Sequence, residues 1–344
     1  MIAPILGRLL DSKVLSRVEA RATFDALVAA DSPEAERVAI LVALASREPR
    51  AIELVEFARE MRRRARAFPL APRDEPVDLC GSGGAPRPSF NVSTVSSFVI
   101  AATGTTVVKH GNRSARGPCG SSDLLEALGL PVTTSLSFAR ASYRMHRLAF
   151  LHAPLYHPAT RAVGPARQLL GIPTIFNRLG PLSNPARVRF QVVGMPNRPA
   201  ARVASIILPQ LGVARGLSMT SADGCDEFSP RARTTAFLWS GRRRERREIL
   251  PERYLPAEDR HGDWGALPPA DAANEAERIL AGGGGARRGS VLLTAGAALW
   301  ITGRSPTLRD GVNLARVGLD DGRAERLLRE MQRLAQRYRK KERV

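Results

Sequence analysis

The first 68 residues place apolar side chains at three- and four-residue spacing, which is the period of an amphipathic helix. Within this stretch, Ser32, Pro33 and Glu34 combine a capping hydroxyl, a first-turn proline and a first-turn acid, and so predict a helix start. Residues 69–76 are rich in proline and charge and are predicted to form a linker. The pattern therefore predicts a small all-helical domain over residues 1–70.

After the linker, short β-rich runs alternate with helical stretches. This alternation is typical of a mostly parallel sheet covered by helices, so we predict a large α/β domain over residues 76–344 and an α/β fold class overall. The predicted strands lie at 77–80, 105–108, 189–193 and 217–220, and the clearest helices at 93–103 and 121–128.

The composition favours a globular protein of the reducing cytoplasm. Hydrophobic residues make up 44% of the chain, and no apolar window reaches the roughly 18 residues that a membrane-spanning helix needs. Three cysteines, Cys80, Cys119 and Cys225, are too few and odd in number for a disulfide framework. They also lack the close pairing of a metal site, which favours small semi-buried cysteines over ligands.

The net charge of +19 raises nucleic acid as a partner, although an anionic small substrate is equally compatible with it. Only four of the 52 basic residues are lysine, so the excess is spread over many arginines. The densest basic runs, at 61–66, 241–247 and 337–343, are predicted to be solvated faces or loops. No aromatic residues interleave with them to stack on bases, so nucleic acid binding is not favoured.

The first candidate for chemistry follows the strand predicted at 77–80. The sequence CGSGG is followed by a helix start rich in hydroxyl and amide groups. Glycines let backbone N–H groups approach an anion, and a helix N-terminus adds free donors and partial positive charge. Glycines alone favour a structural turn, but Asn91, Ser93 and Thr94 are placed to cap the helix and bind a phosphate or its metal.

The second candidate is the sequence VVKHGNRS, in which a strand ends in a polar turn. Lys109 comes where the strand reaches the carboxyl edge of the sheet, and its ammonium group suits phosphate. His110 is equally explained as a turn histidine. Residues 119–126, CGSSDLLE, again join glycine, hydroxyls and a helix start, which makes them a second candidate anion cradle.

The third candidate is the acidic turn DGCDE, which follows the strand predicted at 217–220. Asp226 and Glu227 offer the hard oxygen ligands that Mg²⁺ prefers. Acidic turns on protein surfaces are commoner than metal sites. The two neighbouring candidates for phosphate binding favour the metal interpretation, because pyrophosphate normally binds together with magnesium.

Taken in order, these motifs resemble the anthranilate phosphoribosyltransferase family, whose fold is related to that of pyrimidine nucleoside phosphorylases. The resemblance covers roughly residues 71–322. It rests on the sequences FNVST (90–94), KHGNRS (109–114), GSSDLLEALG (120–129), YHPA (156–159), LGIPTIFNRLGPLSNPA (170–186), DGCDE (223–227) and LLTAGAAL (292–299).

The resemblance implies a helical domain joined to an α/β domain, with the chain returning to the small domain around 155–185, and a homodimer formed through the helical domains. It also implies a magnesium-dependent transfer of the phosphoribosyl group from phosphoribosyl pyrophosphate to anthranilate, in tryptophan biosynthesis. No side chain is assigned as an acid or base. The implied residues are Gly81, Gly83, Gly84, Asn91, Ser93, Thr94, Lys109 and Ser121 for the donor, Asn112, His157 and Arg167 for the aromatic acid, and Ser93, Asp226 and Glu227 for magnesium.

The chain departs from the family pattern in its glycine loop. The usual GTGGDG is followed two positions on by asparagine, whereas Ala85, Pro86 and Pro88 stand at the acid, glycine and asparagine positions here. Thr160 and Thr294 also replace residues typical of the family. These differences leave open a paralogue with another aromatic acceptor, and a non-catalytic nucleic-acid-binding homologue.

Overall fold

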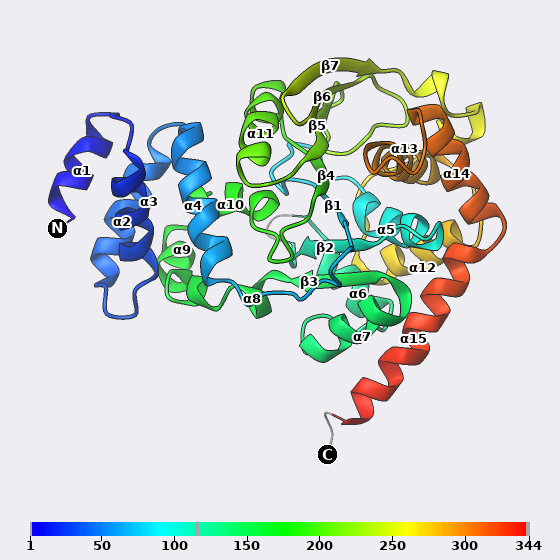
Figure 1. Ribbon diagram of the computed structural model, residues 1–344, viewed down its shortest axis with the longest axis horizontal. Coiled ribbons are helices and arrows are strands. Elements are labelled where there is room, and N and C mark those ends of the chain that lie inside the picture. Colours follow the sequence, from blue (N-terminus) through cyan, green and yellow to red (C-terminus); the bar gives the residue numbers. More distant parts are fainter. Residues whose placement is uncertain (1, 115–116, 342–344) are drawn as a thin grey trace.

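The computed structural model describes residues 2–114 and 117–341, and the end of the basic run at 337–343 lies outside them. Figure 1 shows a group of N-terminal helices beside a larger body built around a sheet. The helices are α1 (Ala3–Leu10), α2 (Arg17–Val28), α3 (Glu34–Ala45), α4 (Ala51–Arg64), α5 (Val92–Ala102), α6 (Ser121–Ala127), α7 (Leu136–His146), α8 (Ala153–Tyr156), α9 (Gly164–Leu170), α10 (Ile175–Leu179), α11 (Arg198–Gln210), α12 (Pro269–Leu280), α13 (Ala286–Ile301), α14 (Leu308–Asp320) and α15 (Arg323–Lys341). The strands are β1 (Val77–Cys80), β2 (Val107–Gly111), β3 (Leu148–His152), β4 (Phe190–Gly194), β5 (Arg215–Ser221), β6 (Thr234–Ser240) and β7 (Arg243–Ile249).

The seven strands form one sheet in the order β3-β2-β1-β4-β5-β6-β7. The first five are parallel, and β6 and β7 add an antiparallel hairpin at one edge. The chain builds outward from β1 through β2 to β3, then crosses to the other side of β1 to form β4 and β5. Ligands in open α/β sheets bind in the crevice at such a reversal, outside the carboxyl ends of the strands.

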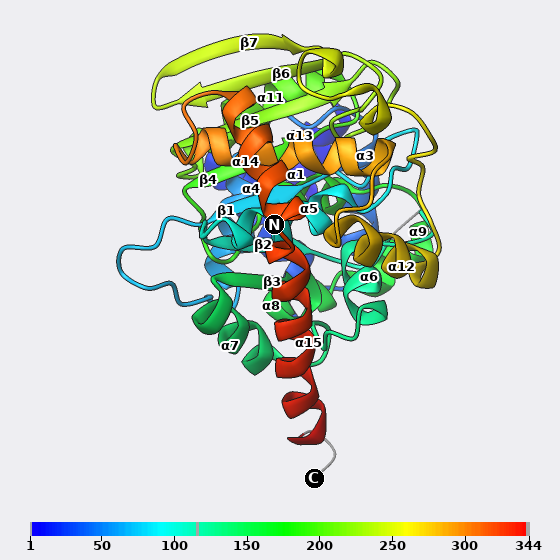
Figure 2. The same cartoon turned by 90° about the vertical axis from the view of Figure 1, so that its right-hand side faces the viewer.

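Three apolar clusters of the described residues contact the sheet, and the smallest packs Phe68 and Tyr143 against β2 and β3. On one face, α5 and α12 to α15 share a continuous core with the strands. A second core joins α11, Val193 of β4 and Trp239 of β6 to the helical group at the N-terminus. Figure 2 shows α15 running down the outside of the body toward the C-terminus. The predicted fold class, a small helical domain with a large, mostly parallel α/β domain, is confirmed.

The segment after β3 packs against the N-terminal helices. Val163, Phe176 and Leu179 are buried in the same core as α1 to α4, and the ring centroids of Phe176 and Phe24 lie 6.2 Å apart. Residues 163–182 therefore share a core with the helical group. The domain boundaries at residues 70 and 76 stay predictions.

The basic runs do not all lie on solvated faces. Arg62 is 7% exposed and donates hydrogen bonds to the carbonyl oxygens of Leu182, at 2.7 Å, and Leu211, at 2.6 Å. It thereby ties α4 to segments more than a hundred residues away. Burial lowers the pKa of Arg62 to about 10, and the charge of Asp78 partly opposes this shift. The expectation of a solvated run was wrong here because these buried carbonyl groups need donors.

The run at 241–247 is mostly exposed, as predicted for a solvated face, although most of it forms the edge strand β7 rather than a loop. Strands β3, β6 and β7 were not predicted from the sequence. Pairs of exposed arginines, each followed by one glutamate, line β7, and such charges discourage pairing with another sheet edge. The start of α3 differs as well, since Pro33 is the N-cap residue and the helix start has no side-chain capping bond.

Within the described ranges, we find no helix that combines the length and the apolar character needed to cross a membrane.

The contact between α13 and α14 gives a matched test of the larger core. Val312 is 1% exposed and Val317 of the same helix is 52% exposed. We expect Val312→Ala to lower the free energy of unfolding by roughly 2 to 3 kcal/mol, because it removes buried methyl groups and leaves a cavity. Val317→Ala should change it by less than about 0.5 kcal/mol. Urea unfolding followed by circular dichroism measures both, and equal effects would contradict this account of the core.

Candidate active site

A cavity of about 460 Å³ opens at the carboxyl ends of β1 and β2. Its walls come from the loops after these strands, from the start of α5 and from the turn after β5. Met61 of α4 and Phe176 of α10 close it on the side of the helical group. The cavity therefore lies at the reversal of strand order and is lined by both parts of the chain.

The structure brings nearly all the predicted site residues to this one cavity. Gly84 is the exception: it does not line the cavity, and its N–H donates to Ser82 Oγ at 3.1 Å. The residues that line the cavity as predicted are Gly81, Gly83, Asn91, Ser93, Thr94, Lys109, Asn112, Ser121, His157, Arg167, Asp226 and Glu227. Their roles toward ligands stay predictions.

The start of α5 presents unused polar groups to the cavity. Asn91 is the N-cap residue but makes no capping bond, because its side-chain Nδ2 donates to the carbonyl of Cys119 at 3.1 Å. The hydroxyl of Thr94 is buried without a hydrogen-bond partner. A buried polar atom left without a partner is uncommon in a folded protein. The orphaned hydroxyl at a helix N-terminus fits a site that binds an anion.

Lys109 is buried beside the cavity at the end of β2. Its Nζ donates to the carbonyl oxygen of Leu79 at 2.6 Å, and the side chain is only 3% exposed. Asp78 lies on the neighbouring strand and accepts a bond from the N–H of His110 at 3.1 Å. Burial raises the pKa of Asp78, while the charge of Lys109 acts in the opposite direction.

Asp226 and Glu227 are also buried, at 7% and 6% exposure. Burial raises the pKa of Glu227 to about 8, and the charge of Asp226 adds to the shift. Lys109 and hydrogen bonding from Ser93 partly oppose it. Two buried carboxylates that are adjacent in the chain fit a divalent cation, because the charge of the cation would offset theirs.

Among the residues the structure describes, no three histidine, cysteine, aspartate or glutamate side chains are grouped to hold a metal ion. A cation at Asp226 and Glu227 would therefore take its further ligands from hydroxyl, water or substrate oxygens, as Mg²⁺ does in phosphate sites. Cys80, Cys119 and Cys225 are free thiols.

Another wall of the cavity, formed by the segment after β3, carries His157 and Arg167, whereas the third predicted acceptor residue, Asn112, lies on the loop after β2. The guanidinium of Arg167 lies over the ring of Phe176, 5.5 Å from its centroid. The rings of His157 and His110 meet edge to face at 5.0 Å. Neither nitrogen of His157 has a hydrogen-bond partner of good geometry. This wall thus combines an aromatic ring, a cation and unpaired imidazole nitrogens.

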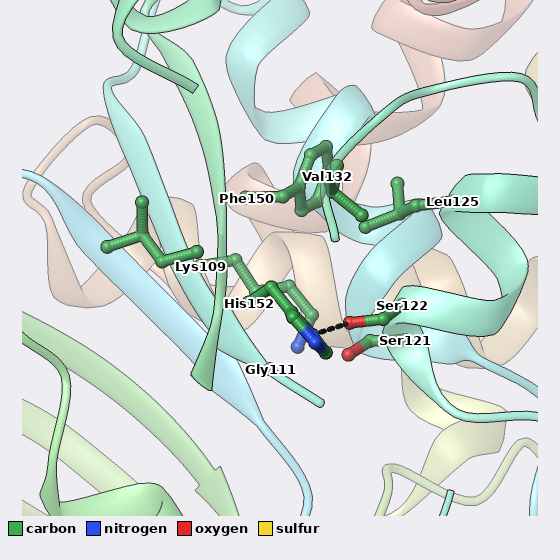
Figure 3. A pocket seen from close by; sticks show the side chains of 9 residues that line it. Lys109, Gly111, Ser121, Ser122, Leu125, Val132, Phe150 and His152 are labelled. Atoms are coloured by element: carbon green, nitrogen blue, oxygen red, sulfur yellow. Dashed lines mark hydrogen bonds between the residues drawn. The ribbon is translucent and has the colours of Figure 1, made fainter. Parts of the chain in front are cut away.

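A second, much smaller cavity lies beside the first and shares Lys109, Gly111 and Ser121 with it. Figure 3 shows Ser122 of α6 facing His152 of β3, with Oγ 2.9 Å from Nδ1. This contact fixes the start of α6 against β3 and so positions Ser121 at the edge of the main cavity.

Among the cavity residues that sequence reasoning missed, Ser82 and Phe176 contact predicted site residues directly. The hydroxyl of Ser82 donates a hydrogen bond to Asp226. The sequence feature that could have indicated Ser82 is a hydroxyl residue between the glycines of the loop. Phe176 lies beneath Arg167, and only its place within the motif at 170–186 could have indicated it.

Comparison with known proteins places the chain in a family. Residues 3–65 match the family described as "Glycosyl transferase family, helical bundle domain", and residues 73–325 match "Glycosyl transferase family, a/b domain". The chain is 37% identical over 326 residues to the anthranilate phosphoribosyltransferase of Solibacter usitatus, covering 94% of this chain and 95% of that one. The chain belongs to the anthranilate phosphoribosyltransferase family. The predicted resemblance and the predicted enzyme class, a glycosyltransferase, are confirmed.

Further relatives agree with this membership. Anthranilate phosphoribosyltransferase 2 of Streptomyces coelicolor is 38% identical over 314 residues, which cover 91% of this chain and 93% of the relative. The crystal structure of the Thermus thermophilus enzyme superposes with a TM-score of 0.85 at 34% identity, covering 96% of this chain and 99% of that one. A yeast enzyme, solved in complex with PRPP and Mg, has the same fold at 22% identity and a TM-score of 0.84, with 96% of each chain covered.

The buried histidine of the acceptor wall generates a prediction on pH. Burial lowers the pKa of His157 to about 4, and the nearby carbonyl groups of Met61 and Ser183 oppose this only in part. An exposed imidazole titrates near pH 6.5, so the unfolded chain binds a proton that the folded chain does not. We expect His157 to remove roughly 3 kcal/mol of stability as the pH falls from about 6.5 to about 4.

His157→Asn should make the fall in unfolding free energy between pH 7 and pH 4 shallower. The slope is compared with that of the unchanged protein over the same pH range, and circular dichroism verifies that the variant is folded. Urea unfolding at several pH values measures the slope, and a variant slope equal to that of the original protein would argue against a neutral buried His157.

Proposed function

We propose that this enzyme transfers the phosphoribosyl group of phosphoribosyl pyrophosphate to the amine of anthranilate and releases pyrophosphate. The observation that supports this best is the single cavity that joins a glycine loop, a helix N-terminus and a buried lysine to a paired carboxylate site and an arginine-lined aromatic wall. The names of the relatives support the same reaction. Transfer to another aromatic acid remains the second candidate, because Thr160 lies on the cavity wall.

The donor side would hold the pyrophosphate by its oxygen atoms. The backbone of the glycine loop, the free hydroxyl of Thr94 and the ammonium group of Lys109 are all suited to a polyanion. Asp226 and Glu227, with Ser93, would hold Mg²⁺. When bound, this ion neutralises the charge that develops on the departing pyrophosphate. The remaining task of the chain is to align donor and acceptor and to keep water out.

The acceptor side would bind the aromatic acid by its carboxylate. The planar fork of Arg167 suits a carboxylate, and Phe176 beneath it keeps the guanidinium in place. The uncharged amine of anthranilate attacks the anomeric carbon as the bond to pyrophosphate breaks, and the new C–N bond leaves a proton to be lost from nitrogen. Because burial lowers the pKa of His157 to about 4, this histidine is neutral at physiological pH and adds no positive charge opposite the amine.

The altered glycine loop fits the donor site as well. Ala85 and Pro88 line the cavity, and Ser89 pairs with Gly265 while the N–H of Phe90 donates to the carbonyl of Trp264 at 3.2 Å. The loop is thus anchored at its far end and stiffened by its prolines. This anchoring supports a preformed donor cradle rather than a lost one.

The direct test mixes the protein with phosphoribosyl pyrophosphate, Mg²⁺ and anthranilate, and follows the loss of anthranilate fluorescence with pyrophosphate release in parallel. We expect turnover that stops when EDTA removes the cation. Turnover only with other aromatic acids would support the second candidate. Absence of donor binding by calorimetry would overturn the donor site, and salt-sensitive binding of DNA would then favour the nucleic-acid alternative.

Arg167 provides a test of the acceptor wall. We expect Arg167→Ala to raise the KM for anthranilate by about 10- to 100-fold, since a charge-assisted hydrogen bond is worth roughly 1.5 to 3 kcal/mol, and to change the KM for the donor little. Arg161→Ala, at an exposed arginine nearby in the chain, is the matched control and should change neither. Steady-state kinetics decide the point, and equal increases for both substrates would remove Arg167 from the acceptor wall.

We also propose that two copies pair through the helical group. Several large apolar side chains of this group are exposed, among them Leu10 at 72% and Val18 at 79%. Light scattering should give the mass of a dimer, and Leu10→Asp with Val18→Asp should shift it to that of a monomer. A monomer mass for the unchanged protein would contradict the proposal, as would a dimer that survives both substitutions.

A further inference from the structure

The glycine loop already binds an anion, and that anion belongs to the chain itself. Oδ2 of Asp226 accepts a hydrogen bond from Ser82 Oγ at 2.8 Å and another from the N–H of Gly83 at 3.1 Å. Loops of this kind offer the same donors to phosphate oxygens. The carboxylate of Asp226 therefore occupies donors that a diphosphate would need.

The backbone of Asp226 is held in place on both sides. The N–H of Ser221 donates to the carbonyl of Cys225 at 3.1 Å, and its hydroxyl donates to the carbonyl of Glu227 at 2.7 Å. The carbonyl oxygen of Asp226 lies so close to Gly194 that a Cβ there would come within 1.5 Å of it. Withdrawal of the carboxylate from the loop must therefore occur by side-chain rotation.

The same carboxylate has two competing tasks. As a ligand of a divalent cation it must turn its oxygens toward the cation, whereas in this structure one oxygen is committed to the loop. A diphosphate cannot use the donors of Ser82 and Gly83 while Asp226 holds them, and two anions at one position also repel each other. The cation and the diphosphate thus both depend on where this one side chain points.

We propose that Asp226 is a positioning residue that blocks the glycine loop against diphosphate until a divalent cation draws it away. Cation binding then frees Ser82 and Gly83 for the phosphate oxygens, so each ligand strengthens the binding of the other. This inference rests on the proposed function, because it assigns the diphosphate and the cation to this cavity. It adds to that function that a side chain of the protein itself, Asp226, competes with the diphosphate for the loop donors.

The test uses isothermal titration calorimetry with inorganic pyrophosphate, with excess Mg²⁺ and with EDTA. In EDTA we expect Asp226→Asn to bind pyrophosphate about tenfold or more tightly than the unchanged protein, because the uncharged amide competes less well for the loop donors. With Mg²⁺ the order should reverse, because the variant has lost a cation ligand. This reversal is the signature of the block.

Asp223→Asn is the charge-matched control. Asp223 lies in the same turn, but its carboxylate accepts from Ser229 Oγ at 2.8 Å rather than from the loop. If Asp226 acts only by charge repulsion, both variants should tighten metal-free pyrophosphate binding alike, and that result would overturn the block. We expect Asp223→Asn to change the affinity for metal-free pyrophosphate less than about threefold. Circular dichroism and thermal unfolding verify that each variant is folded.

A second variant tests the block from the side of the loop. Ser82→Ala removes one of the two donors that hold Asp226, and should therefore tighten the binding of Mn²⁺ alone severalfold, as measured by electron paramagnetic resonance. Unchanged Mn²⁺ affinity would contradict a held carboxylate. Failure of the block is distinguishable from failure of the proposed function, because in the latter case pyrophosphate would not bind the unchanged protein even with Mg²⁺.

Discussion

The close approach of the acidic turn to the crevice between β1 and β4 is the constraint on which the site depends. These strands are parallel neighbours in the sheet, but the strand that follows β1 lies on one side of the pair and the strand that follows β4 lies on the other. Their carboxyl ends therefore open a gap. The carbonyl of Asp226 fills this gap against Gly194, and its carboxylate reaches the glycine loop after β1. A side chain larger than hydrogen at position 194 would separate the acidic turn from the loop, and both halves of the donor site would lose their alignment.

Burial of charge gives the cavity its chemical character. Lys109, Asp78 and Glu227 are all nearly excluded from solvent, and each would be costly to hold without an opposing charge or hydrogen bond. Lys109 offsets part of the negative charge of its two neighbours, because its charge opposes the upward pKa shift that burial gives to each of them. The balance remains incomplete on the acidic side. A ligand that brings a cation together with an anion would complete it, which is the composition of a metal-bound diphosphate.

Local sequence signals predicted the parts of the site but not their contacts. The strand, glycine loop and helix start at 77–94 are encoded within a few residues of one another, and the structure has them where the pattern placed them. The contact between Ser82 and Asp226 spans 144 positions, and no local pattern contains it. The same holds for Arg62, whose basic run predicts solvent exposure while its carbonyl partners are supplied by distant segments. The edge strand β7 was missed because its charged sequence lacks an apolar face.

The prolines of the glycine loop restrict a backbone segment that is already held at both ends. A loop that must close over a ligand loses conformational entropy on binding, and that loss is smaller when its backbone is already restricted. Here Pro86 and Pro88 restrict the segment between two fixed points, the contact of Gly83 with Asp226 and the pairing of Ser89 with Gly265. At the position where the family pattern has an acid, Ala85 adds no charge. The backbone of the loop is thus restricted before the ligand binds, and the carboxylate of Asp226 occupies its donors until the cation draws that side chain away.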